Sequence, residues 1–174
     1  GSCMEIKLKG MPAPDLTRAA YVAPTAAVAG DVTVGEGSSI WFGAAIRGDG
    51  HPIRIGRFCN IQDNAVLHAD EEYAITLGDY VSVGHGAIVH GCRLEDSVLV
   101  GMNATLLNGV QVGEGSLIAA GALVPENTLI PPHCLVMGVP ARVKGPLTPQ
   151  QREIVAANWK EYEKLSALYA QSEE

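Results

Sequence analysis

Aliphatic residues recur at every sixth position through most of this 174-residue chain. Every position of the series is Val, Ile or Leu, and most are β-branched residues, which favour strands. A period of six fits neither an α-helix nor a simple alternation, and it is typical of a parallel β-helix, in which three hexapeptides form one triangular coil. We therefore predict an all-β solenoid of about six coils. The positions of the series are Val22, Val28, Val34, Ile40, Ile46, Ile55, Ile61, Leu67, Leu77, Val83, Val89, Leu94, Val100, Leu106, Val112, Ile118, Val124, Ile130 and Val136.

The series is interrupted in three places. Three extra residues stand in 46–55, four extra residues stand in 67–77, and one residue is missing in 89–94. Insertions into a solenoid emerge as loops on one face, where such proteins commonly bind their ligands. The interruptions therefore indicate where a functional site lies.

The last part of the chain has a different pattern. Thr148, Pro149 and Gln151 match an N-cap, a first-turn Pro and a capping-box Gln. Apolar residues then follow at helical spacing and predict a helix over about 149–170 that packs along the solenoid; a coiled-coil partner is the alternative. We divide the chain into an N-terminal segment (1–14, beginning with a cloning remnant before Met4), a β-helix domain (15–145) and a C-terminal helical segment (146–174).

Charge, hydropathy and the positions of the cysteines narrow the possible classes of protein. With 12 Lys and Arg against 19 Asp and Glu, the net charge of −7 argues against nucleic-acid binding. No apolar run reaches the roughly 18 residues of a membrane span, and no signal peptide is visible, so we expect a cytoplasmic protein. Cys59, Cys92 and Cys134 each precede a position of the series by two, a place that is often held by Ala or Ser, which predicts small buried side chains.

The phase of the histidines relative to the series suggests a metal site. His68 follows Leu67 and His90 follows Val89, so the two histidines should stack at one corner, one coil apart. His85 has another phase and should point away within one chain, but a symmetric trimer can place it against the other two histidines of a neighbour. Three imidazoles with an open fourth position suit a catalytic zinc ion. Three solvent-exposed turn residues are the alternative.

Further polar residues share these corners. Arg47 has the phase of His68 one coil earlier, and Asp49 follows it, which suggests an interface salt bridge. Gln62 should lie beneath His85, where it either orients a metal-bound water or caps a turn. His51 and His133 are out of phase beside prolines and are interpreted as surface residues.

The strings RGDGHPIRIG, NIQDNAVLH and GHGAIVHGC resemble those of the γ-class carbonic anhydrase family of hexapeptide-repeat proteins, over roughly residues 15–145. The resemblance implies a left-handed parallel β-helix with a C-terminal helix, assembled as a homotrimer with metal sites between subunits. It implies that His68 and His90 come from one subunit and His85 from the next. The expected metal is zinc, with iron or cobalt as alternatives.

The resemblance also assigns further roles. Asn60 and Gln62 match residues near the metal-bound water, and Tyr162 matches a helix tyrosine near the site. Arg47 and Asp49 match the family's interface Arg and Asp.

The chain departs from well-studied family members at two points. Gly50 stands where those members carry Glu, and the loop ADEEY is much shorter than their acidic loop, with Glu71 near the place of a proton-shuttling glutamate. A weakened proton relay predicts metal binding with slow hydration of CO₂ to bicarbonate. The alternatives are an acyl-CoA thioesterase or hexapeptide-repeat acyltransferase, and a non-catalytic trimeric scaffold.

Overall fold

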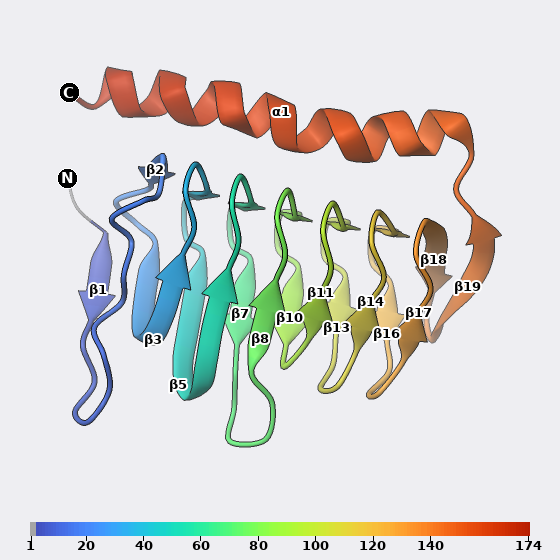
Figure 1. Ribbon diagram of the computed structural model, residues 1–174, viewed down its shortest axis with the longest axis horizontal. Helices are drawn as coiled ribbons and strands as arrows, with labels where there is room; N and C mark the ends of the chain where they lie inside the picture. Colours follow the sequence, from blue (N-terminus) through green and yellow to red (C-terminus); the bar gives the residue numbers. More distant parts are fainter. Residues whose placement is uncertain (1–2) are drawn as a thin grey trace.

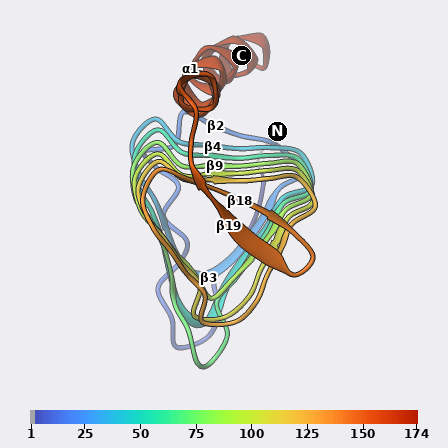
Figure 2. The ribbon, with the colours of Figure 1, turned by 90° about the vertical axis from the view of Figure 1, so that its right-hand side faces the viewer.

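The computed structural model describes residues 3–174, which form a parallel β-helix followed by one long α-helix (Figure 1). Viewed along its axis, the β-helix is a three-sided prism (Figure 2). In Figure 1 the strands rise on the near face, cross beneath the helix and descend on the far face while the coils advance to the right, so the coils are left-handed. The predicted fold is confirmed.

The three faces of the prism are named here in the order in which the chain forms them. Face A holds the first halves of β3 (Ala27–Val34) and β5 (Ala45–Ile55), then β7 (Val66–His68), β10 (Ile88–His90), β13 (Thr105–Leu106) and β16 (Leu123–Val124). Face B holds their second halves, then β8 (Ile75–Leu77), β11 (Arg93–Leu94), β14 (Gln111–Val112) and β17 (Leu129–Ile130).

Face C comprises β2 (Tyr21–Val22), β4 (Ser39–Ile40), β6 (Asn60–Ile61), β9 (Ser82–Val83), β12 (Leu99–Val100), β15 (Leu117–Ile118) and β18 (Cys134–Gly138), with β19 (Ala141–Pro146) paired antiparallel to β18. The chain turns from face C to face A at the C–A corner and from face A to face B at the A–B corner. Before the first coil, β1 (Met4–Ile6) pairs with β3, so the N-terminal segment extends the sheet.

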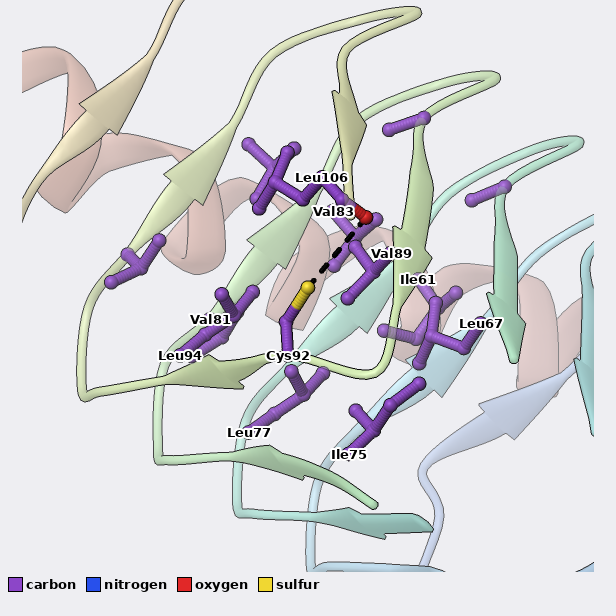
Figure 3. Close-up of a cluster of buried hydrophobic side chains, with 14 of the residues drawn as sticks. Ile61, Leu67, Ile75, Leu77, Val81, Val83, Val89, Cys92, Leu94 and Leu106 are labelled. Atoms are coloured by element: carbon purple, nitrogen blue, oxygen red, sulfur yellow. Dashed lines mark hydrogen bonds between the residues drawn. The ribbon is translucent and has the colours of Figure 1, made fainter. Parts of the chain in front are cut away.

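The six-residue series forms the core. Every position of the series except Val22 is buried, and the labelled side chains in Figure 3, such as Leu67 and Val89, gather in the interior of the prism. Cys59 and Cys92 are buried as predicted. Cys134 is only partly buried, because no further coil covers it at the end of the prism.

The structure corrects one prediction about the insertions. The extra residues in 46–55 form no loop: β5 continues around the A–B corner as one strand of 11 residues. The insertion in 67–77 does leave the prism as a loop between β7 and β8, seen as the green loop at the bottom of Figures 1 and 2. The missing residue in 89–94 is taken up by a tight turn at Gly91, whose φ is +63°.

Helix α1 (Pro149–Ser172) runs along face C and starts with the predicted capping box, in which Gln151 N donates to Thr148 Oγ1. The helix packs through aromatic contacts: the ring centroids of Trp41 and Tyr162 are 5.4 Å apart, and those of Trp41 and Tyr169 are 5.0 Å apart. Within residues 3–174, no helix has the length and apolar character needed to cross a membrane.

Candidate metal centre

Two histidines converge at the A–B corner. His68 ends β7 and His90 ends β10, and the strand register pairs the two residues directly, one coil apart. Nδ1 of His68 lies 3.0 Å from Nε2 of His90, and both rings are partly buried. The stacking predicted from the phase of the histidines is confirmed.

The other ring nitrogen of each histidine is held by a polar side chain. Nε2 of His68 lies 3.0 Å from Oδ1 of Asp49, and Nδ1 of His90 lies 2.7 Å from Oδ1 of Asn108. Such contacts fix the tautomer and ring orientation of histidines that bind metals. Because they leave one nitrogen of each ring directed at the other ring, the pair fits a metal ion that needs two neighbouring imidazole ligands.

Both supporting side chains are themselves anchored. Asp49 accepts a hydrogen bond of 2.8 Å from Arg47, and Asn108 donates one of 2.9 Å to Asp70. The Asn108 amide, followed by the backbone N–H of Glu72, lowers the pKa of Asp70 to about 2. Sequence reasoning missed Asn108, although it comes two residues after Leu106, one coil beyond His90 at the same corner.

His85 lies at the other edge of face A. It follows β9 at the C–A corner, and its Nδ1 lies 3.0 Å from Oδ1 of Asp63, one coil earlier. Within residues 3–174, no three His, Cys, Asp or Glu side chains come close enough to hold a metal ion. The prediction that His85 points away from the other two histidines within one chain agrees with this arrangement.

A cavity of about 390 Å³ lies beside His85, between face C and α1. Its polar wall includes Gln62, whose Nε2 donates to Asn60 Oδ1 at 2.9 Å and, more weakly, to Asn158 Oδ1 at 3.4 Å. Asn60 in turn donates to Ser82 Oγ at 2.9 Å. Asn60 and Gln62 are buried, so this chain of hydrogen bonds holds the Gln62 amide in one orientation beside His85.

The two remaining predicted site residues, Tyr162 and Glu71, lie in different parts of the molecule. Tyr162 lines the cavity from α1, and burial, followed by the charges of Asp63 and Glu161, raises its pKa to about 12. Glu71 lies in the exposed loop after β7, and its backbone carbonyl lies 2.9 Å from Nε2 of His51. Glu71 therefore lies on the side of the A–B corner, not beside the cavity.

The predicted site residues thus fall into two groups on opposite edges of face A. Arg47, Asp49, His68 and His90 gather at the A–B corner with Asn108. The C–A corner and the adjoining cavity hold Asn60, Gln62, His85 and Tyr162. Neither group alone forms a three-histidine metal site.

Comparisons with known proteins agree with this architecture. Residues 91–126 match the model of the bacterial transferase hexapeptide (six repeats). A relative from Methanocaldococcus jannaschii, named "Probable carbonic anhydrase", is 50% identical over 83% of this chain and 91% of its own length. "Gamma carbonic anhydrase 1, mitochondrial" from Arabidopsis thaliana is 41% identical over 91% of this chain and 60% of its own length. The solved structure of a hexapeptide transferase family protein from Anaplasma phagocytophilum superposes with a TM-score of 0.90, at 31% identity over 95% of this chain and 98% of that one.

Proposed function

Because the chain belongs to the γ-class carbonic anhydrase-like family of hexapeptide-repeat proteins, we propose that it is a metal-dependent enzyme that hydrates CO₂ reversibly to bicarbonate. The observation that carries the proposal is the division of three histidines between two edges of one face. His68 and His90 present two convergent nitrogens at the A–B corner, and His85 stands at the C–A corner beside Gln62.

A homotrimer completes the site. In a closed ring of three copies, the A–B corner of one copy meets the C–A corner of the next, so each interface unites one His68–His90 pair with one His85. Three imidazoles with one open position are the ligand set of a catalytic zinc ion; iron and cobalt accept the same ligands. The trimer therefore contains three equivalent sites.

The surface of face A supports this assembly. Outward-facing residues in register along it are Ala45, Val66, Ile88, Thr105 and Leu123, none of which is charged. The corresponding row on face B contains two charged residues and consists of Thr33, Arg54, Thr76, Arg93, Gln111 and Leu129. Subunit interfaces are depleted in charged residues at their centres, so face A is the face suited to contact other copies.

The protein's own side chains hold and orient the reacting groups. A bound zinc ion supplies Lewis acidity, which makes a water molecule acidic enough to serve as a nucleophile near neutral pH. Asp49 and Asn108 fix the rings of His68 and His90, and Asp63 fixes His85. Gln62, whose Nε2 is held by Asn60, would offer its amide oxygen to that water and orient it.

The cavity favours a second candidate function. Its apolar wall includes Leu99, Met102, Ala120 and Ile154, and about 390 Å³ is far more space than CO₂ needs. An acyl chain would fill such a space, so hydrolysis or transfer of an acyl group from a coenzyme A thioester is the alternative.

The deciding experiment compares both activities on metal-reconstituted protein. Stopped-flow CO₂ hydration is measured beside a panel of acyl-CoA thioesters, with metal content and light scattering recorded on the same samples. We expect a particle near three times 18.2 kDa, bound metal and CO₂ hydration. His90→Ala should lose metal and activity, whereas His133→Ala, at the far end of the prism, should keep both. Thioester cleavage without CO₂ hydration would favour the alternative, and bound metal with neither activity would indicate a scaffold.

A further inference from the structure

The hydrogen bonds behind His90 have a direction. Asn108 lies between His90 and Asp70: its amide oxygen Oδ1 lies 2.7 Å from Nδ1 of His90, and its amide nitrogen Nδ2 donates to Oδ2 of Asp70 at 2.9 Å. A side-chain amide has one accepting atom and one donating atom, so His90 faces whichever of the two atoms the group at position 70 does not take. That group therefore determines whether Asn108 offers His90 an acceptor or a donor.

Asp70 can only accept hydrogen bonds. Its Oδ1 accepts from the backbone N–H of Glu72 at 2.8 Å and from that of Tyr73 at 3.2 Å, which folds the start of the loop between β7 and β8 and holds the carboxylate in place. Because a carboxylate has no hydrogen to donate, Asn108 must turn Nδ2 toward Asp70 and Oδ1 toward His90. Only a His90 ring with a hydrogen on Nδ1 can donate to that oxygen.

Both histidines of the pair are thereby held in matching states. Nε2 of His68 faces the carboxylate of Asp49 directly at 3.0 Å, and Nδ1 of His90 faces a carboxylate through Asn108. Each ring carries a hydrogen on the nitrogen that points away from the pair, and the two remaining nitrogens, 3.0 Å apart, turn lone pairs toward each other. A metal ion between them needs these unprotonated nitrogens, and the hydrogen bond at the far nitrogen selects which one is free.

We propose that Asp70 is a positioning residue of the metal centre: through Asn108 it fixes His90 in the tautomer that leaves Nε2 free to bind the metal ion. If the group at position 70 donates instead, the Asn108 amide reverses and presents Nδ2 to His90, whose ring then carries its hydrogen on Nε2. That hydrogen donates to Nδ1 of His68, so an internal hydrogen bond occupies both nitrogens that the metal needs. The effect on metal affinity rests on the function proposed above, whereas the tautomer of His90 does not.

Asp70→Asn separates this role from the folding of the loop. The amide oxygen of the new side chain still accepts from the backbone of the loop, while its NH₂ group faces Asn108. Heteronuclear NMR of the metal-free full chain, isotope-labelled at the histidine rings, should show a hydrogen on Nδ1 of His90 in the wild type and none there in Asp70→Asn. Zinc affinity, measured by competition with a chelator, should fall by about 10–100-fold.

The matched control is Asp15→Asn. Asp15 accepts from the backbone N–H of Thr17 in a similar turn and bridges to Thr33 on the first coil, away from the His68–His90 pair. Its substitution removes the same charge and should change neither the tautomer of His90 nor the zinc affinity. Circular dichroism verifies that each variant is folded.

Exchanging the two side chains tests the direction of the hydrogen bonds themselves. When Asp70→Asn is combined with Asn108→Asp, the amide at position 70 donates to the carboxylate at position 108, which again offers His90 only acceptors. The hydrogen should return to Nδ1 of His90, and zinc affinity should return to within about threefold of that of the wild type.

A hydrogen that stays on Nδ1 of His90 in Asp70→Asn would overturn the role of Asp70. A folded double variant that recovers neither the tautomer nor the zinc affinity would overturn it as well. Because the NMR measurement uses metal-free protein, it reports on Asp70 alone. Absence of metal binding or of CO₂ hydration in the wild type would instead refute the proposed function.

Discussion

His90 lies one coil beyond His68, with 3.0 Å between Nε2 of the first and Nδ1 of the second. This proximity follows from the repeat itself, because three hexapeptides complete one coil and return the chain to the same corner. His85 lies at the C–A corner, on the opposite edge of face A, so it does not contact His68 or His90 within one chain. The division of the histidines leads directly to a test of whether the metal site is shared between subunits.

Mixing two inactive variants should restore metal sites. His85→Ala and His90→Ala should each lose metal, because tight catalytic sites use three protein ligands. In a mixed trimer, a copy with intact His85 can meet a copy with intact His68 and His90, so some interfaces regain all three ligands. Metal content is measured on heterotrimers purified with two different affinity tags.

The matched control mixes His68→Ala with His90→Ala, which damages the same corner twice and should restore nothing. If verified heterotrimers of His85→Ala and His90→Ala also bound no metal, a site shared between subunits would be refuted.

Most of the fold could be predicted from the sequence, because each coil repeats the same local pattern. The buried Val, Ile and Leu residues, the helix start at Thr148 and the stacking of His68 on His90 all follow from spacing. The continuous strand β5 could not be predicted. The length of an insertion does not tell whether its residues leave the prism as a loop or stay paired with the strands of faces A and B around the corner. Asn108 was missed because its role depends on a side-chain contact with His90.

Asn108→Ala should weaken metal binding by about 10–100-fold, the usual cost of removing a residue that orients a metal ligand. The amide holds Nδ1 of His90, and without it the ring can rotate away from His68. Metal affinity is measured by competition with a chromogenic chelator. Asn127→Ala is the control, because Asn127 stands one coil further along the same ladder and accepts a hydrogen bond from Tyr73 instead. Equal affinities in the two variants would contradict the role given to Asn108.

Val112→Asp should prevent folding. Val112 is fully buried on the axis of the prism, and an unpaired carboxylate there costs several kcal/mol against a total stability of about 5–15 kcal/mol. The neighbouring Gln111 faces outward and is exposed, so Gln111→Asp should fold normally. Thermal unfolding followed by circular dichroism compares the two variants. A cooperative transition in Val112→Asp near that of the wild type would show that the hexapeptide phase is misassigned.

The cysteines should separate into two classes by reactivity. Burial raises the pKa of Cys59 and of Cys92 to about 12, so at pH 8 only about one thiol in ten thousand at either position is the reactive thiolate. Cys3 and Cys134 are partly exposed. A disulfide reagent should therefore modify two thiols rapidly in the native protein and all four after denaturation.

Cys59→Ala tests the same assignment through stability and activity. We expect a loss of about 1 kcal/mol in unfolding free energy, typical of a small core substitution, and no loss of activity. A folded, inactive Cys59→Ala trimer would instead identify Cys59 as a nucleophile.

The last prediction concerns the proton released when CO₂ is hydrated. Gly50 leaves no carboxylate after Asp49, and the loop between β7 and β8 that carries Glu71 is short. Proton export then depends on molecules from solution, so turnover should be slow and should rise with imidazole concentration at constant pH and ionic strength. If Glu71 still carries part of the proton flux, Glu71→Gln lowers turnover at low buffer only, and high imidazole restores it. Glu72→Gln, the adjacent exposed control, should match the wild type at every buffer concentration. Fast turnover that does not depend on buffer would show that another side chain completes the relay.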